Sequence, residues 1–325
     1  MSQPRPRLVV LTADGTQPPG NEAALRSLAD LRYATEADLA EALPGADVLF
    51  SWDFFSGALR AAWPAADALR WVHVAAAGVD AMLFGELAES SVVVTNSRGV
   101  FDQPIAEFVL ASVLAHDKLL HESKALQRRH EWRHREVTRT AGRHVLVVGT
   151  GAIGRACGQL LRAAGLQVRG AGRRAVSGDP DLGEIVLTSE LAQHVGWADH
   201  VVLIAPLTPQ TRHVVSAEVL AAMKPTAHLI NVGRGALVDE TALVAALQRG
   251  EIAAASLDVV ETEPLPDDSP LWDLEQVALS AHMCGDVVGW RDELAALFED
   301  NLRRYVAGRS LRNVVDKHSG FVARG

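Results

Sequence analysis

Three polar side chains stand just beyond short β-rich runs in the second half of the chain. Arg234, Glu263 and His282 each follow such a run, the first at 229–232 and the last at 277–279. If the runs are strands of one parallel sheet, their carboxyl ends lie at a single edge, which is where ligands bind. We therefore expect the three side chains to lie near one another.

The three residue types suit the reduction of a 2-keto acid. Arg234 can hold a carboxylate through two parallel hydrogen bonds, and His282 can donate a proton to the carbonyl oxygen as hydride arrives. Glu263 beside it would favour the protonated imidazole. Singly, each has a structural explanation, as a surface arginine, a loop acid before Pro264 or one of 12 histidines. The prediction depends on the ordered set.

A glycine motif predicts a dinucleotide site. The sequence GTGAIG at 149–154 follows the β-rich run at 144–148 and begins a helical pattern that ends before Gly165. In this context the first glycine permits a tight turn, the second lets a pyrophosphate approach, and the third lets helix and strand pack closely. The helix N-terminus then favours the anion. The alternative is an ordinary glycine-rich turn.

The next β-rich run suggests which nicotinamide nucleotide is bound. It ends at Gly172, where an NAD site usually has an acidic residue for the ribose 2′-hydroxyl, and Arg173 and Arg174 follow. Without the acid a 2′-phosphate is not repelled, and the two arginines can hold it by charge-assisted bonds. We therefore favour NADP(H), with NAD as a second possibility. The alternative is that both arginines are exposed loop residues.

Two series of β-rich runs and helical segments must position these residues. The first has strands predicted at 8–11, 47–50, 71–74 and 92–94, with helices at 22–31 and 36–43. After a long helix at about 104–118, the second has strands predicted at 144–148, 167–169, 200–204, 229–232, 254–257 and 277–279. Alternation of this kind predicts parallel α/β sheets. The basic stretch at 122–143 is expected to be a solvated helix or loop, with a binding patch as the alternative.

Composition limits the class of protein. The chain has 325 residues, 48% of them hydrophobic and 22% charged, which is typical of a soluble protein long enough for two domains. A net charge of −9 does not suit nucleic acid, and we predict no nucleic-acid, membrane or metal partner. The two cysteines favour a reducing compartment, and the first residues lack a signal-peptide pattern. We expect a cytoplasmic protein.

The ordered motifs resemble the D-isomer-specific 2-hydroxyacid dehydrogenase family, and most closely its glyoxylate/hydroxypyruvate reductase-like branch. The similar segments are 94–99, 104–107, 149–154, 205–211, 223–235, 258–266 and 270–272, followed by 301–302, Gly308 and 314–315. Two positions depart from the family pattern: Gly172 replaces the usual acid, and Ala281 stands where proline is usual before the histidine. Formate dehydrogenases are also similar, but they carry glutamine where Glu263 stands.

The resemblance implies an architecture. It implies two Rossmann-like or flavodoxin-like parallel-sheet domains with a cleft between them. Residues 1–102 and 287–325 would form the substrate domain, and residues 103–286 the dinucleotide-binding domain. The enzyme would be a homodimer joined through helices of the cofactor domain, with residues 122–143 in the dimer region.

The resemblance also implies roles for individual residues. Arg234, Glu263 and His282 would be catalytic, and Asp258 would lie near the nicotinamide carboxamide. Together with residues named from the motifs, the predicted cofactor-binding set is Gly149, Gly151, Ala152, Ile153, Gly154, Arg173, Arg174, Ala205, Pro206, Thr211, Val232, Gly233, Asp258, His282 and Gly285. The predicted substrate-binding set is Ala77, Gly78, Val79, Arg234, His282, Trp52 and Trp290.

Two alternatives stay open. The aromatic residues Trp52, Phe54, Phe55 and Trp290 can form an apolar wall over the substrate side chain or belong to the core. The chain can also be a nucleotide-sensing, corepressor-like interaction protein without significant turnover, since transcriptional corepressors resemble the same family. Measurable turnover would distinguish a dehydrogenase from such an interaction protein.

Overall fold

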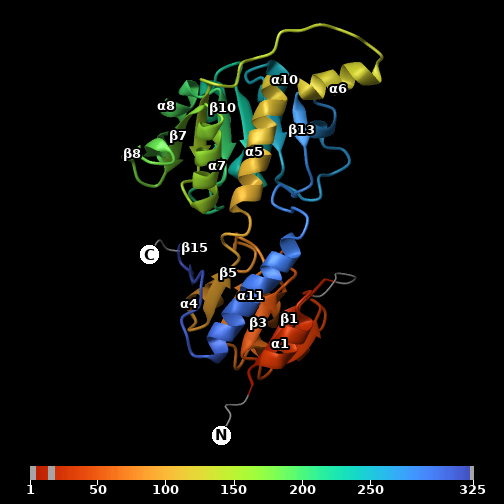
Figure 1. Ribbon diagram of the computed structural model, residues 1–325, viewed down its shortest axis with the longest axis vertical. Coiled ribbons are helices and arrows are strands. Elements are labelled where there is room, and N and C mark those ends of the chain that lie inside the picture. Colours follow the sequence, from red (N-terminus) through yellow and green to blue (C-terminus); the bar gives the residue numbers. More distant parts are fainter. Residues whose placement is uncertain (1–4, 14–18, 323–325) are drawn as a thin grey trace. The chain divides into compact units, whose positions relative to one another are not determined.

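The computed structural model describes residues 5–13 and 19–322, which form two compact α/β units (Figure 1). Unit 1 combines Met1–Phe101 with Val287–Gly325, and unit 2 is Asp102–Asp286. The C-terminal segment therefore belongs to the same unit as the N-terminal third. Over the described ranges, no helix is long and apolar enough to span a membrane.

Unit 1 contains a five-stranded parallel sheet in the order β2-β1-β3-β4-β5. This order is the flavodoxin-like one. The strands are β1 (Arg7–Leu11), β2 (Asp30–Ala34), β3 (Val48–Ser51), β4 (Trp71–Val74) and β5 (Val93–Asn96), and a small antiparallel pair is β14 (Val315–Asp316) with β15 (Phe321–Val322). The helices are α1 (Glu22–Leu28), α2 (Leu39–Ala42), α3 (Ala58–Ala62), α4 (Gly85–Glu89) and α11 (Trp290–Val306), with a 3₁₀ turn at Trp63–Ala65.

Aromatic packing holds α11 against this sheet. The ring of Phe298 stacks on Phe50 of β3 at 3.9 Å between centroids and on Trp71 of β4 at 5.3 Å. All three side chains are fully buried. Because large aromatic side chains contribute much of the burial energy of a core, these contacts explain why the returning C-terminal helix belongs to unit 1.

Strand β2 corrects the sequence prediction of a helix over 22–31. Helix α1 ends at Leu28, and β2 begins two residues later at Asp30. This strand lies at the edge of the sheet and pairs only with β1, so its sequence DLRYA is half polar and lacks the apolar run of an inner strand. The apolar residues at 25–31 fitted a helical period equally well.

Unit 2 contains an eight-stranded sheet in the order β13-β12-β11-β10-β6-β7-β9-β8, parallel except for the β8–β9 pair. Reading from β9 through β7 and β6 to β10, β11 and β12 gives the dinucleotide-binding order 3-2-1-4-5-6. The strands are β6 (His144–Val148), β7 (Gln167–Gly172), β8 (Val176–Asp179), β9 (Gly183–Leu187), β10 (His200–Leu203), β11 (His228–Asn231), β12 (Ala254–Leu257) and β13 (Val277–Leu279). The strand order reverses between β6 and β10, which is where such sheets bind ligands.

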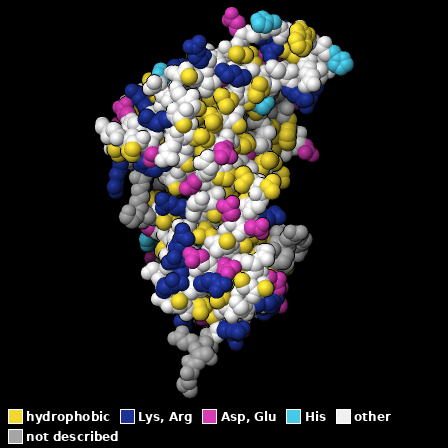
Figure 2. Space-filling model, viewed as in Figure 1, with side chains coloured by type: hydrophobic (Ala, Val, Ile, Leu, Met, Phe, Trp, Pro, Cys, Tyr) yellow, Lys and Arg dark blue, Asp and Glu magenta, His cyan; other side chains and the backbone are white. Residues whose placement is uncertain are grey.

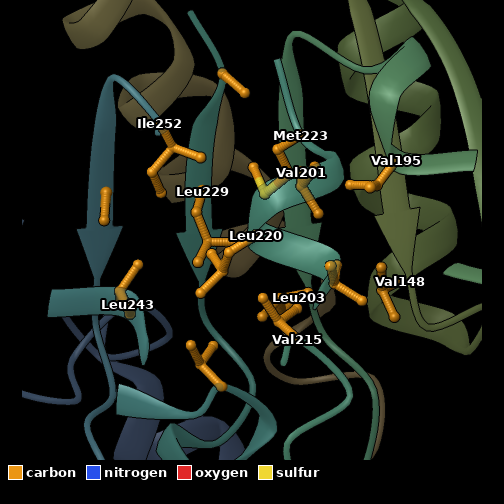
Figure 3. Close-up of a cluster of buried hydrophobic side chains, with 14 of the residues drawn as sticks. Val148, Val195, Val201, Leu203, Val215, Leu220, Met223, Leu229, Leu243 and Ile252 are labelled. Atoms are coloured by element: carbon orange, nitrogen blue, oxygen red, sulfur yellow. The ribbon is translucent and has the colours of Figure 1, made fainter. Parts of the chain in front are cut away.

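Helices cover the sheet of unit 2 and bury a mainly aliphatic core. Figure 3 shows Val148, Val201, Leu203 and Leu229 of the strands packed among side chains that include Leu220. The helices are α5 (Asp102–Asp117), α6 (Leu120–Arg128), α7 (Ala152–Ala163), α8 (Leu191–His194), α9 (Ala217–Ala222) and α10 (Glu240–Arg249), with 3₁₀ turns at Thr188–Glu190, Val195–Trp197, Gly235–Leu237 and Pro270–Trp272.

Helix α6 and the extended segment 129–143 project from the rest of unit 2 (Figure 1). The sequence prediction of a solvated helix or loop at 122–143 fits this conformation. The segment carries charged residues, but the side chain of Trp132 is fully exposed, and Leu120 and Val137 are also exposed. Elsewhere, Lys and Arg side chains are interspersed with Asp and Glu on the face shown in Figure 2.

Candidate active site

The predicted catalytic residues all lie in unit 2, beyond the carboxyl ends of neighbouring strands. Arg234 follows β11, Glu263 lies in the segment after β12, and His282 follows β13. These three strands are consecutive and parallel in the sheet. Their order in the sheet therefore brings the three segments to one edge, as the sequence pattern predicted.

Glu263 and His282 form a direct pair. The Oε2 atom of Glu263 lies 2.7 Å from Nδ1 of His282, and Oε1 accepts a hydrogen bond of 3.2 Å from the backbone N–H of Val260. Partial burial opposes ionisation of Glu263, but the His282 imidazole, the Val260 N–H and the Arg234 charge outweigh it and lower the pKa of that carboxyl. The carboxylate is thus ionised at neutral pH and fixes the imidazole through one ring nitrogen. The other ring nitrogen, Nε2, is the one able to exchange a proton with a substrate.

Asp258 anchors the loop that carries His282. Its carboxylate accepts hydrogen bonds from the Ser280 hydroxyl at 2.6 Å and from the backbone N–H groups of Met283 and Cys284 at 3.0 Å each. Its backbone carbonyl accepts a further bond from the N–H of His282 at 2.8 Å. His282 itself adopts a left-handed conformation with φ 50°, which is uncommon for a residue other than glycine. The anchoring of this loop was not anticipated from the sequence.

Arg234 lies in a turn that other polar groups shape. Asn231 at the end of β11 donates from Nδ2 to the carbonyl of Arg234 at 2.9 Å, and its Oδ1 accepts from the N–H of Gly233 at 3.1 Å. One guanidinium nitrogen of Arg234 bonds the carbonyl of Gly233 at 2.8 Å. The sequence analysis missed Asn231. Its only signal was an amide residue at the very end of an apolar strand.

Close backbone packing joins the Arg234 turn to the segment that leads to Glu263. A Cβ atom on Gly235 would lie 1.9 Å from both the carbonyl carbon and oxygen of Val260. Only glycine fits at this position. The two segments therefore approach more closely than any side chain would allow, and Arg234 comes near enough to contribute to the lowered pKa of Glu263.

The glycine motif forms the cradle that a nucleotide site requires. Gly149 has φ 120°, and a Cβ atom there would lie 2.7 Å from the backbone N of Ala205. A Cβ atom on Gly154 would lie 1.9 Å from the carbonyl oxygen of Gly149. Gly151 precedes the first residue of α7, so the loop leads directly into the N-terminus of a 12-residue helix. Ala152 and Ile153 form its first turn. These residues fit a dinucleotide pyrophosphate.

The remaining predicted cofactor residues lie on loops at the same edge of the sheet. Ala205 and Pro206 follow β10, and the hydroxyl of Thr211 donates to the carbonyl of Pro206 at 2.7 Å, which closes that loop. Val232 and Gly233 follow β11, and Gly285 is a buried residue beyond His282. Gly172 is the last residue of β7, and the side chains of Arg173 and Arg174 after it are exposed. All of them belong to unit 2.

The predicted substrate-binding residues Ala77, Gly78 and Val79 lie in unit 1, just beyond β4. Asn96 donates from Nδ2 to the carbonyl of Ala77 at 2.6 Å, and the N–H of Ser97 donates to the carbonyl of Ala76 at 2.9 Å. The carbonyl groups of this loop are therefore hydrogen-bonded to residues at the end of β5. The N–H side is the one predicted to hold a carboxylate.

The aromatic residues of unit 1 divide between core and surface. Trp52 is only 5% exposed and packs edge-on against Phe50, so most of its surface is core. Phe55 is 61% exposed and contacts the ring of Phe54. Trp290 is half-buried and lies 5.9 Å from the ring of Phe54. Phe55 is thus the most accessible of the four side chains.

Within the described ranges, no three His, Cys, Asp or Glu side chains are grouped so that they could hold a metal ion. The chemistry at the site is that of a guanidinium, an imidazole and a carboxylate next to a nucleotide cradle. Such a set can bind an organic acid and move a proton at its oxygen.

Comparison with known proteins reveals similarity to one group of dehydrogenases. Residues 110–284 match the family described as D-isomer specific 2-hydroxyacid dehydrogenase, NAD binding domain. A glyoxylate reductase from Korarchaeum cryptofilum is 33% identical over 261 residues, which cover 78% of each chain.

Two solved structures are similar over nearly the whole chain. A D-isomer specific 2-hydroxyacid dehydrogenase from Xanthobacter autotrophicus, in complex with NADPH and MES, is 31% identical with a TM-score of 0.82 over 97% of this chain and 100% of its own. An NADPH-dependent glyoxylate/hydroxypyruvate reductase from Sinorhizobium meliloti, in complex with NADP and sulfate, is 26% identical with a TM-score of 0.81 over 97% of this chain and 100% of its own.

Proposed function

This chain belongs to the D-isomer specific 2-hydroxyacid dehydrogenase family, and on that premise we propose that it is an oxidoreductase that transfers a hydride between NADPH and a small 2-keto acid. The observation that carries the proposal is the Glu263–His282 pair, held at 2.7 Å at the same sheet edge as Arg234 and the glycine cradle. Glyoxylate and hydroxypyruvate are the proposed substrates, since similar proteins are named reductases of these acids.

Each residue of the pair and Arg234 has a distinct task. The bound nicotinamide supplies or accepts the hydride. Arg234 binds the substrate carboxylate and polarises the adjacent carbonyl, as a planar guanidinium can do through paired hydrogen bonds. His282 donates the proton from Nε2 to the carbonyl oxygen, because Nδ1 is bound to Glu263. Glu263 orients the imidazole through its hydrogen bond to Nδ1.

The loop beyond β4 is the proposed second contact for the substrate carboxylate. The N–H groups of Ala77, Gly78 and Val79 are its donors, and the bond from Asn96 to the carbonyl of Ala77 keeps the loop in place. In this reading unit 1 is the substrate domain and unit 2 the dinucleotide-binding domain. Trp290, near Phe54, would contact the substrate side chain, whereas the burial of Trp52 restricts it to a supporting contact.

NADPH is the proposed cofactor, with NADH used less well. The absence of a side chain at Gly172 and the exposed Arg173 and Arg174 support this preference, because guanidinium groups bind phosphate strongly. Two similar proteins were solved with NADPH or NADP. Asp258 stands near the proposed nicotinamide position in the family pattern, but both of its carboxylate oxygens already accept hydrogen bonds from the His282 loop.

Purified protein tested against a panel of acids decides the proposal. Oxidation of NADPH and of NADH is followed with glyoxylate, hydroxypyruvate, pyruvate and phenylpyruvate, and the kcat/KM values are compared. We expect turnover with the smaller acids and a higher kcat/KM for NADPH. Folded protein that binds NADPH but reduces none of the acids would overturn the proposal.

A homodimer in the cytoplasm is the proposed state of the enzyme. The fully exposed Trp132, with Leu120 and Val137, gives the projecting segment of unit 2 apolar surface that a second copy would cover. Light scattering should give a dimer mass, and Trp132→Ser with Leu120→Ser should reduce it to that of a monomer.

The two buried free thiols, Cys157 and Cys284, suit a reducing compartment, and cell fractionation tests the location.

A further inference from the structure

The tightest obstacle to a side chain at Gly172 is the side chain of Thr150, and the backbone conformation of Gly172 is not an obstacle. Gly172 does not have the positive φ that favours glycine, so an L-residue could adopt its conformation. A Cβ atom there would nevertheless lie 3.0 Å from both Cγ2 and Oγ1 of Thr150, closer than ordinary van der Waals contact. The next neighbour, Cγ2 of Ile185, would be at an ordinary 3.5 Å.

The other glycines of the cradle are required for a different reason. A Cβ atom on Gly149 or on Gly154 would collide with backbone atoms, at 2.7 Å and 1.9 Å respectively. No side-chain replacement elsewhere relieves those collisions. At Gly172 the obstacle is one threonine side chain, so the size of the side chain at position 150 affects whether position 172 can carry a side chain.

The surroundings of Gly172 favour a phosphate over a hydroxyl. Arg173 and Arg174 follow it directly and are exposed. The carboxylates of the following hairpin, Asp179 and Asp181, both bond Arg155 of α7, at 2.6 Å and 2.7 Å. Arg155 therefore offsets one of these two negative charges, and an acidic side chain at position 172 would add a further negative charge at the end of β7.

We propose that Thr150 is a specificity-determining residue for the nucleotide, acting as a steric block against an acidic side chain at position 172. This inference rests on the proposed NADPH-dependent function and deepens it. The glycine loop that receives the pyrophosphate and the strand end that faces the ribose are coupled through this one contact. An aspartate at 172 requires the side chain of Thr150 to shift by a few tenths of an ångström. A change toward NADH thus requires replacements at both positions.

Nucleotide binding by four variants tests the coupling. The variants are Gly172→Asp, Thr150→Ala, the double variant Thr150→Ala/Gly172→Asp, and Thr150→Val/Gly172→Asp as the matched control that keeps the bulk of threonine. Dissociation constants for NADPH and NADH are measured by calorimetry, which needs no turnover. Thermal unfolding is recorded for each protein.

We expect Gly172→Asp to weaken NADPH binding without a gain for NADH. The alanine double variant should bind NADH about tenfold more tightly than that single variant, a coupling of the size seen between touching residues. The valine double variant should behave like the single variant. Thr150→Ala alone should change both constants by the same factor.

Two results would overturn the inference. One is a Gly172→Asp variant that binds NADH as tightly as the alanine double variant, and the other is a valine double variant that matches the alanine one. If Gly172→Asp does not fold, Gly172→Ala replaces it. The added methyl group should then lower Tm when Thr150 is present and leave it unchanged when Gly172→Ala is combined with Thr150→Ala. Wild-type protein without NADPH preference would contradict the proposed cofactor, whereas the coupling is judged from the variants alone.

Discussion

Replacing Asp258 with asparagine tests whether this buried carboxylate fixes the conformation of the loop that carries His282. The wild-type carboxylate accepts three hydrogen bonds, from the Ser280 hydroxyl at 2.6 Å and from the Met283 and Cys284 amides at 3.0 Å each. Asparagine keeps one acceptor oxygen and replaces the other with an NH₂ donor. At least one of the three donors therefore faces another donor in the variant.

The magnitude follows from the burial of the site. Hydrogen bonds to a charged acceptor contribute roughly 1.5–3 kcal/mol, and a buried N–H left without an acceptor costs about 1–3 kcal/mol. Asp258 is only 2% exposed, so water does not replace the lost partner. We expect the free energy of unfolding of unit 2 to fall by about 2–4 kcal/mol, which lowers Tm by roughly 5–10 °C for a domain of this size. A resulting displacement of His282 by about 1 Å would lower kcat about 100-fold.

We would measure three properties of Asp258→Asn: its thermal unfolding by calorimetry, its steady-state kinetics and its dissociation constant for NADPH. Ser280→Ala is the matched control, because it removes one of the three bonds and leaves no donor facing another donor, so it should lower stability by roughly 1.5–3 kcal/mol at most. If Asp258→Asn melts with the wild type and loses only NADPH affinity, the anchoring argument is wrong. That result would favour direct contact between Asp258 and the nicotinamide carboxamide.

Three further outcomes are expected. Arg234→Ala should lower kcat/KM for keto acids by about 100- to 1000-fold, as for other lost donors to a developing charge, and near-normal kinetics would remove its role. Glu263→Gln removes the carboxylate that orients His282 and whose own pKa lies below its usual range, so kcat should fall and the acidic limb of the pH–rate profile should shift, and an unchanged pH–rate profile would contradict the pairing. Burial lowers the pKa of His73 to about 3 and, with a smaller effect of nearby His200, that of His116 to about 4. Below about pH 6.5 the histidines of the unfolded chain bind protons, whereas these two histidines stay neutral in the native protein. Their burial therefore costs no stability above that pH. Stability should then fall by about 1.4 kcal/mol per pH unit for each histidine toward pH 4, and equal unfolding free energies at pH 7 and pH 5 would refute the burial argument.

The inner strands of both sheets could be predicted because they are apolar on both faces. The inner strands β4, β6 and β12 begin and end where the sequence predicted them, and so does the edge strand β13. The three inner strands are almost wholly buried, so their mainly apolar runs stand out. The α/β fold class was confirmed for the same reason.

Three strands lack this signal: the edge strands β2 and β8, and β9, which lies between β7 and β8. Strands β2, β8 and β9 were not predicted. β8 consists of exposed residues around Gly178, and β9 is half exposed, so their pairing depends on neighbours distant in the sequence and not on local composition.

Supporting contacts within the site were also beyond the sequence. The residue types and order of Arg234, Glu263 and His282 indicated a reaction, since chemistry restricts which side chains serve. The bonds that Asp258 makes to residues 280–284 join positions more than 20 apart in sequence, and no local pattern marks them. The same is true of the contact between Thr150 and Gly172.

Transfer of deuterium tests the central claim most directly. NADPH carrying deuterium at the reactive carbon of the nicotinamide is incubated with hydroxypyruvate and either the wild-type protein or His282→Ala, and the product is analysed by NMR. We predict that the wild type gives a D-2-hydroxy acid with deuterium at C2, and that His282→Ala gives the same product at least about 100-fold more slowly. Wild-type product without deuterium at C2, or a His282→Ala rate equal to that of the wild type, would contradict hydride transfer assisted by this histidine.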